Sequence, residues 1–181
     1  MKFLAIAALL LTGCGALEFG TPPPASGPQQ EPGASETALG AMSMCALVPL
    51  ADVQEKSPFQ TPLAAVRAGA LPGTCEYRSA DDATDPVSIV LTVTEYGSSS
   101  DARSALADAR QTAVDAGLPV DDLNGLADGG FASGVDDVGV QARLGNLVIE
   151  AQFKGEWPDT TDDAKVTAGK QLIRTIVGRL P

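Results

Sequence analysis

The chain contains no histidine, and only 4% of its 181 residues are aromatic. Without an imidazole it has no Ser-His-Asp or Cys-His nucleophile, and the common zinc hydrolase sites lack their usual ligand. The sequence also lacks the Gly-x-Ser-x-Gly, P-loop and Gly-x-Gly-x-x-Gly motifs. Because the most common catalytic and nucleotide-binding sites are excluded, we expect a protein that is not an enzyme and that uses no cofactor.

Paired carboxylates are a catalytic arrangement that needs no histidine. A pair of them can hydrolyse a glycosidic bond, but the sequence does not give their separation, so a carboxylate-dependent hydrolase stays as a less favoured alternative. Segment 122–125, Asp-Leu-Asn-Gly, partly resembles a calcium loop, yet its glycine comes too early and the later glutamate is missing. We therefore expect no metal site.

Basic residues are scarce: 12 lysines and arginines stand against 23 acids, for a net charge of −11. Like charge disfavours nucleic acid and anionic lipid headgroups as partners, so we expect no nucleic-acid binding. The acids occur as scattered Asp-Asp pairs and not as one tail. Their excess either attracts basic partners or, as we favour, keeps the protein soluble.

The sequence has no long hydrophobic run. Its longest uncharged apolar stretch lies near the N-terminus. Lys2 precedes an apolar stretch at 3–11, which is far shorter than the ~20 residues that a membrane-spanning helix needs. A charged start, a short apolar run and small residues are typical of an export signal. The next residues, Leu-Thr-Gly-Cys at 11–14, resemble the lipobox of bacterial lipoproteins, whose cysteine receives a diacylglycerol.

This resemblance implies a signal peptide at 1–13 that is removed and a lipid on Cys14 that anchors the chain to the outer face of the plasma membrane. Loss of 1–13 removes Lys2 and no acid, so the charge changes from −11 to −12. Residues 14–42 are rich in Pro, Gly, Ser and Ala, which predicts a disordered tether. We expect a single folded domain at 43–181.

Two cysteines remain in that domain, Cys45 and Cys75. In an oxidising compartment an even pair most simply forms a disulfide. Closing the thirty-residue loop stabilises the fold by at most ~3.5 kcal/mol on the loop-entropy estimate. Redox catalysis would favour Cys-x-x-Cys, and two thiolates without histidine make a poor zinc site.

The clearest local pattern is a β-hairpin over 138–153. Apolar residues alternate with others on both sides of Gly145-Asn146, which fits a two-residue primed turn. That turn places four apolar pairs on one face of the ribbon. The pairs are Leu144 with Leu147, Ala142 with Ile149, Val140 with Ala151 and Val138 with Phe153. On the other face Arg143 lies diagonal to Glu150, within reach of a weak ion pair.

Further patterns predict strands at 75–78, 87–94 and 131–133. Helices are expected at 99–116, capped by Ser99 or Ser100, and at 162–178, with short helices at 49–54 and 62–68. The fold class is α+β: an antiparallel sheet of about four to five strands, helices packed on one face and one disulfide. Trp157 is either an exposed recognition residue or, as we favour, a residue that packs at the edge of the core.

The layout resembles actinobacterial cell-envelope lipoproteins that carry a domain of unknown function. The resemblance rests on the lipobox, the Pro-rich tether, the Cys-Ala-Leu-Val segment at 45–48 and the Cys-Glu-Tyr segment at 75–77. Segment 123–131 is similar to their Gly-Leu-Gly-Asp-x-Ala-aromatic segment, with Ala127 replacing the second glycine and Gly130 the alanine. The arrangement is also similar to extracellular sensor domains of actinobacterial receptor kinases. This likeness implies binding or sensing and assigns no catalytic residue.

We therefore expect a monomeric, membrane-anchored envelope lipoprotein whose non-enzymatic domain binds or senses a small molecule or an envelope protein. The alternative is a structural or protein-interaction lipoprotein without a small ligand. A large apolar pocket would favour the ligand, and a flat exposed apolar patch would favour the protein partner. The residues Glu76, Tyr77 and Arg78 beside Cys75 form either part of a site or simply a strand next to the disulfide.

Overall fold

The computed structural model describes residues 43–57, 63–68, 73–79 and 87–180, which belong to one compact unit of the chain. The predicted signal peptide at 1–13, Cys14 and the predicted tether at 14–42 lie outside the described residues. Within the described part, no helix combines the length and the apolar character that crossing a bilayer requires.

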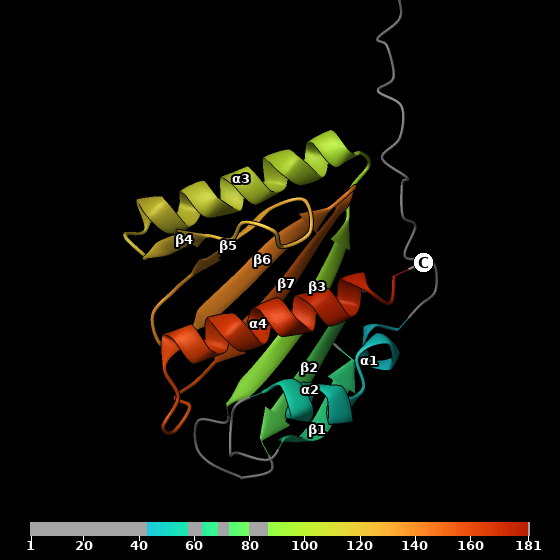
Figure 1. The fold of residues 1–181 in the computed structure, drawn as a ribbon, viewed down its shortest axis with the longest axis vertical. Coiled ribbons are helices and arrows are strands. Elements are labelled where there is room, and N and C mark those ends of the chain that lie inside the picture. The colour runs from blue at the N-terminus through green and yellow to red at the C-terminus, as the bar shows by residue number, and fades with distance from the viewer. Residues whose placement is uncertain (1–42, 58–62, 69–72, 80–86, 181) are drawn as a thin grey trace, which may run out of the picture. The chain divides into compact units, whose positions relative to one another are not determined.

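The described elements are four helices and seven strands (Figure 1). The helices are α1 (Met44–Leu47), α2 (Leu50–Lys56), α3 (Ser99–Asp115) and α4 (Asp162–Val177). The strands are β1 (Leu63–Ala68), β2 (Thr74–Ser79), β3 (Ser88–Glu95), β4 (Val120–Asp122), β5 (Gly130–Ser133), β6 (Val138–Leu144) and β7 (Leu147–Lys154). The predicted α+β class with an antiparallel sheet is confirmed.

The described strands form one sheet in the order β1-β2-β3-β7-β6-β5-β4. It therefore has seven strands, so the predicted number of four to five is wrong. One missing strand is β4, which carries two aspartates in its three residues and so has little strand propensity of its own. Its backbone is held by pairing with β5.

The other missing strand is β1, where the sequence predicted a short helix at 62–68. Leu63–Ala68 instead pairs antiparallel with β2, with Val66 opposite Tyr77. Leucine, alanine and arginine favour helices, but the free edge of β2 offers a row of backbone groups that need partners. Pairing at that edge overrides the local preference.

The hairpin was predicted with the right register. β6 and β7 pair Leu144 with Leu147 and continue to Val138 opposite Phe153. Gly145 adopts a φ of 58°, as the first position of a primed turn requires. In the sequence, the alternation of apolar residues and the Gly-Asn turn both predict this register of β6 and β7.

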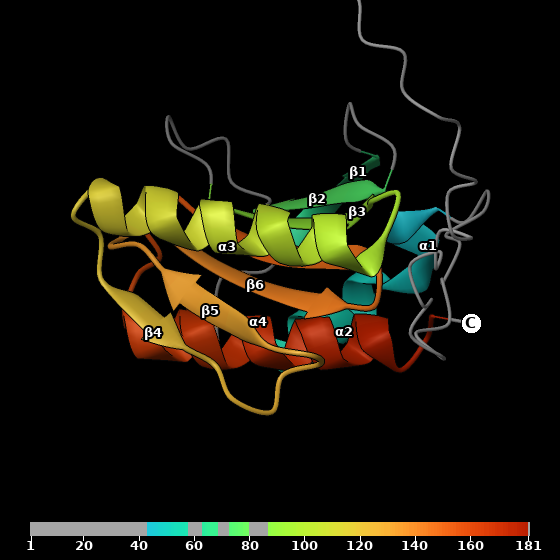
Figure 2. The same ribbon diagram turned by 90° about the horizontal axis from the view of Figure 1, so that it is seen from above.

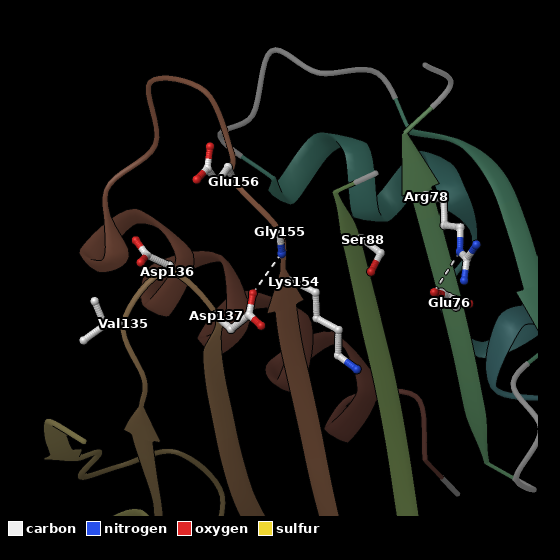
Figure 3. Close-up of a pocket in the computed structure, with 9 residues that line it drawn as sticks. All are labelled: Glu76, Arg78, Ser88, Val135, Asp136, Asp137, Lys154, Gly155 and Glu156. Carbon is white, nitrogen blue, oxygen red and sulfur yellow. Dashed lines mark hydrogen bonds and ion pairs between the residues drawn. The ribbon is translucent and has the colours of Figure 1, made fainter. Parts of the chain in front are cut away.

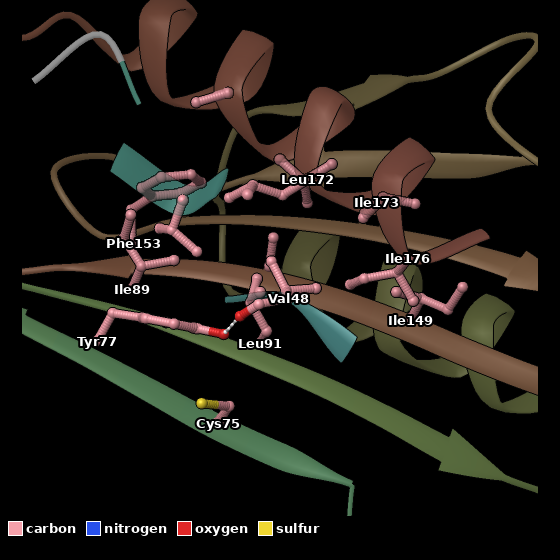
Figure 4. Close-up of a cluster of buried hydrophobic side chains, with 14 of the residues drawn as sticks. Val48, Cys75, Tyr77, Ile89, Leu91, Ile149, Phe153, Leu172, Ile173 and Ile176 are labelled. Carbon is pink, nitrogen blue, oxygen red and sulfur yellow. Dashed lines mark hydrogen bonds between the residues drawn. The ribbon is translucent and has the colours of Figure 1, made fainter. Parts of the chain in front are cut away.

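One face of the sheet carries the hydrophobic core, and we call it the packed face (Figure 4). Tyr77, Leu91 and Phe153 are buried there on three different strands. α4 covers this face, and side chains of α1 and α2 belong to the same cluster. The α4 side chains that are fully buried in the cluster are Leu172, Ile173 and Ile176.

The opposite face, which we call the far face, is partly covered by α3. Asp122 pairs with Phe131, and directly opposed residues point to the same face, where Arg110 of α3 binds Asp122. The next residue, Ala132, points the other way and pairs with Val140 in the core. Figure 2 shows α3 and α4 on opposite sides of β6. The prediction that all helices pack on one face is therefore wrong.

The side chains of α3 explain why its position was missed. Its buried residues are Ala102 and Ala113, a stripe that shows helical periodicity but does not reveal which face it covers. The helix begins after the cap Ser98, whose Oγ accepts a hydrogen bond from the Asp101 N–H, so the predicted caps were one or two residues late. One sequence signal was available: Phe131 and Ala132 are adjacent and both apolar, and a strand that buries both needs cover on both faces.

The disulfide joins Cys45 of α1 to Cys75 of β2, with an S–S distance of 2.05 Å and a Cα–Cα distance of 5.1 Å. Its prediction is confirmed. The bond ties the first described helix to the sheet on the packed face.

Candidate functional site

Among the described helices, α3 packs on the far face over β4–β7 and leaves the ends of β2, β3 and β7 uncovered. Arg78 lies opposite Ser88, and Ser88 lies opposite Lys154, so the three residues form one row across the strands. Opposed residues in such a row have Cβ atoms roughly 5 Å apart. Figure 3 shows the row from the far face, with the Lys154 side chain ending between β7 and β3.

A hollow of about 630 Å³ lies over this row and the loops beside it. It is open to solvent, and most of its lining residues are charged. They are Glu76, Arg78, Ser88, Val135, Asp136, Asp137, Lys154, Gly155 and Glu156. We call this hollow the groove, and it is the candidate functional site.

Two cations lie at the β2–β3–β7 side of the groove. Arg78 Nε donates to Glu76 Oε1 at 2.8 Å, which leaves the two terminal nitrogens of the guanidinium for another acceptor. Lys154 is exposed and makes no ion pair with any described residue. Ser88 lies between them with only 5% of its surface exposed.

Acidic residues form the opposite side of the groove. The Asp137 carboxylate accepts a hydrogen bond from the Gly155 N–H through Oδ1 at 2.8 Å (Figure 3). Asp136, with a φ of 63°, and Glu156 complete this side. Three carboxylates therefore line the side of the groove beside β6 and the segment after β7, whereas the other side holds Arg78, Lys154 and the Glu76 carboxylate that pairs with Arg78.

The acidic side is held in place by Lys165 of α4. This lysine is only 3% exposed, and its ammonium donates to the Asp136 carbonyl at 2.5 Å and lies 3.4 Å from Asp162 Oδ1. A buried ammonium needs such partners, so the contact fixes the loop between β5 and β6 against α4. The Asp136 side chain stays exposed.

The far face also carries a half-buried acid, Glu150, on β7 four residues before Lys154. Burial raises the pKa of Glu150, while a hydrogen bond from Gln141 Nε2 at 3.0 Å and the charge of Lys154 act in the opposite direction. The predicted ion pair between Arg143 and Glu150 is wrong. Arg143 instead lies 3.3 Å from Asp128 Oδ2 and donates to the Gly145 carbonyl, because the loop before β5 brings a carboxylate closer.

The other residues that the sequence singled out have structural roles. Trp157 is 5% exposed and packs edge to face on Phe153 with ring centroids 6.4 Å apart, so the core-edge interpretation is confirmed. Asp122 binds Arg110 with Nε–Oδ1 at 2.8 Å, a contact that lowers the pKa of its carboxyl. Among the described residues, no group of three or more acidic or cysteine side chains could hold a metal ion.

Sequence reasoning found one part of the groove and missed the rest. Glu76 and Arg78 were noted beside Cys75, but Ser88, Asp137 and Lys154 lie on three other segments of the chain. Only the register of β2, β3 and β7 brings them together. The available signal was weak: polar residues recur at alternate positions of these strands, interrupted by Val90 and Val148.

The fold and the groove define an α+β domain with one packed face and one half-open face. No protein-family model matches the chain, and no curated protein or solved structure matches it either.

Proposed function

We propose that this protein is a lipid-anchored lipoprotein of the cell envelope whose domain binds its target through the groove on the far face. The target is a small molecule or a segment of an envelope protein, and the domain acts as a monomer without catalysing a reaction. The observation that carries this proposal is the unequal cover of the sheet. Helices α1, α2 and α4 cover the packed face, whereas Arg78 and Lys154 are exposed on the far face and line the groove.

The character of the groove supports polar recognition. Its lining includes six charged side chains, and its one large apolar side chain is Val135. Over the described surface, the large apolar side chains that are exposed are Val114, Leu118 and Val135. Such a small number favours a polar ligand or peptide over a hydrophobic ligand or a broad apolar interface.

The place where the predicted tether would join also supports the proposal. The described chain begins at Ser43, directly before α1, and α1 packs on the packed face through Met44 and Leu47. The groove lies on the other face of the sheet. A domain anchored through its N-terminus would thus keep the groove clear of its attachment point.

The binding role is tested by cross-linking the full chain in its native envelope and identifying what it retains by mass spectrometry. We expect a retained molecule that is lost from Lys154→Glu, which reverses a charge in the groove. The matched control is Arg174→Glu, an equal charge change on the exposed side of α4. If nothing is retained, or if both variants retain it equally, the groove is not the binding surface.

The anchor has a separate test. Cys14→Ser removes the thiol that would carry the lipid, so the protein should leave the membrane fraction and enter the medium. A variant that stays bound to the membrane, with residues 1–13 still attached as in the wild type, would contradict the lipoprotein assignment.

A further inference from the structure

We infer that the groove binds a short extended peptide with free ends, its carboxylate against Arg78 and Lys154 and its ammonium against the carboxylates of Asp136 and Asp137. This inference rests on the proposed function, since it names the ligand class for the same groove. Three observations carry it: the cationic row, the acidic side opposite, and the distance between them.

The cationic row has the features of a carboxylate site. Arg78 and Lys154 flank Ser88 on neighbouring strands, so a single anion above Ser88 can meet both side chains. Arg78 already donates through Nε to Glu76, which orients its guanidinium and leaves its terminal nitrogens as donors. In a chain with a net charge of −11, two adjacent cations are a local exception that attracts an anionic group.

The acidic side has the features of an ammonium site. Asp137 uses Oδ1 to hold the Gly155 N–H, which leaves Oδ2 as an acceptor. The Asp136 backbone is fixed by Lys165, so its exposed carboxylate is presented from a rigid loop. Glu156 adds a third negative charge on the same side. Cations with several N–H donors, such as a peptide N-terminus, fit this set.

The separation of the two sides sets the length of the ligand. The ligand carboxylate lies above Ser88 on β3, and its ammonium lies beside Asp137, directly before β6; β3, β7 and β6 are consecutive neighbours in the sheet. Two gaps of ~4.8 Å between strands amount to about 10 Å. An extended chain advances ~3.4 Å per residue, so about three residues connect the two charged ends. A free amino acid is too short to reach both.

The probe that tests this inference is tri-alanine with free ends, titrated into the full chain in detergent and followed by calorimetry. N-acetyl tri-alanine lacks the ammonium, and tri-alanine amide lacks the carboxylate. Each modification removes the charge-assisted hydrogen bonds at one end of the peptide. The dissociation constant should therefore rise about tenfold for either modified peptide. Free alanine should bind more weakly still, and added salt should weaken the binding of the free peptide.

Two variants assign the ends. Lys154→Met should weaken binding of the free and the N-acetylated peptide about tenfold and leave the amide unchanged. Asp136→Asn should weaken the free peptide and the amide and leave the N-acetylated peptide unchanged. Lys56→Met on α2, away from the groove, is the control and should change none of them.

Equal binding of the free and capped peptides, or no binding at all, would overturn the inference. The proposed function has its own readout, the molecule retained in the envelope and lost from Lys154→Glu. If that molecule is found while tri-alanine fails to bind, the groove is a binding site for another ligand class and only the peptide inference is wrong. If both fail, the binding role itself is wrong.

Discussion

Tyr77 links the sheet to the N-terminal helices through one buried hydrogen bond. Its hydroxyl donates to the Val48 carbonyl at 2.5 Å, and its side chain is completely buried in the core (Figure 4). Tyr77→Phe keeps the ring but leaves the buried carbonyl of Val48 without this donor. We expect the free energy of unfolding to fall by about 1–3 kcal/mol, measured by urea denaturation at neutral pH.

The same hydroxyl predicts a loss of stability in alkali. Burial, and secondly the charge of Asp52, raise the pKa of Tyr77 above its ordinary value. The folded state therefore holds this proton more tightly than the unfolded state. Its contribution is complete below the unfolded pKa of about 10 and is lost as the pH rises toward the higher folded value. Urea midpoints measured between pH 8 and 11 should fall less steeply for Tyr77→Phe than for the wild type. Tyr96→Phe retains Tyr77 and should behave as the wild type does.

Ala127 has a backbone conformation that suits glycine. Its φ is 50°, between Gly125 at 74° and Gly129 at 127°. An L-residue in the left-handed region costs about 1–2 kcal/mol, part of which the greater chain entropy of unfolded glycine offsets. Ala127→Gly should therefore raise the free energy of unfolding by up to about 1 kcal/mol. Ala107→Gly on the exposed side of α3 is the control and should lower it by about as much. A loss of stability in Ala127→Gly would contradict the prediction.

At the scale of elements, α4 lies so close to the sheet that one of its helical positions has no room for a side chain. A Cβ on Gly169 would lie 2.5 Å from Val140 Cγ2 and 2.9 Å from Val140 Cβ. Alanine favours the helix by about 1 kcal/mol, but overpacking a core costs about 1–3 kcal/mol. Gly169→Ala should therefore lower the thermal midpoint. Gly178→Ala, whose nearest contact would be 3.4 Å away, should leave it unchanged or raise it.

The elements also show how far the sequence predicts this fold. The β6–β7 hairpin, β3 and α4 were predicted because periodicity, turn residues and caps agree within each segment. β1 and β4 were missed because pairing with β2 and β5 creates them. The helix or strand preference of a short segment does not predict which other segment it will pair with.

The candidate site was harder to predict than the fold for the same reason. Arg78 and Lys154 come from strands that lie far apart in the sequence and become neighbours of Ser88 only in the sheet. The position of α3 then decides which part of the far face stays open, and its alanine stripe carries no information about this. A groove formed by the register of distant strands leaves almost no pattern in the sequence.

At the scale of the whole molecule, four contacts tie the two ends of the described chain to the sheet and to each other. The disulfide holds α1 to β2, and Tyr77 holds the turn after α1. Arg179, beyond α4, donates to the Leu47 carbonyl at 2.7 Å and pairs with Asp52 of α2 at 2.5 Å. The N-terminal helices are therefore fixed both to the sheet and to the C-terminal segment.

This arrangement predicts that the disulfide contributes to stability but is not needed for folding. The double variant Cys45→Ala, Cys75→Ala keeps the Tyr77 and Arg179 contacts, so it should fold and lose about 2–4 kcal/mol of unfolding free energy. Its unfolded chain is no longer cross-linked and exposes more surface, so the urea m-value should rise. A reductant should shift the wild type toward the same midpoint and leave the double variant unchanged. If the reductant does not move the wild-type midpoint, Tyr77 and Arg179 already hold the N-terminal helices as firmly as the covalent bond does.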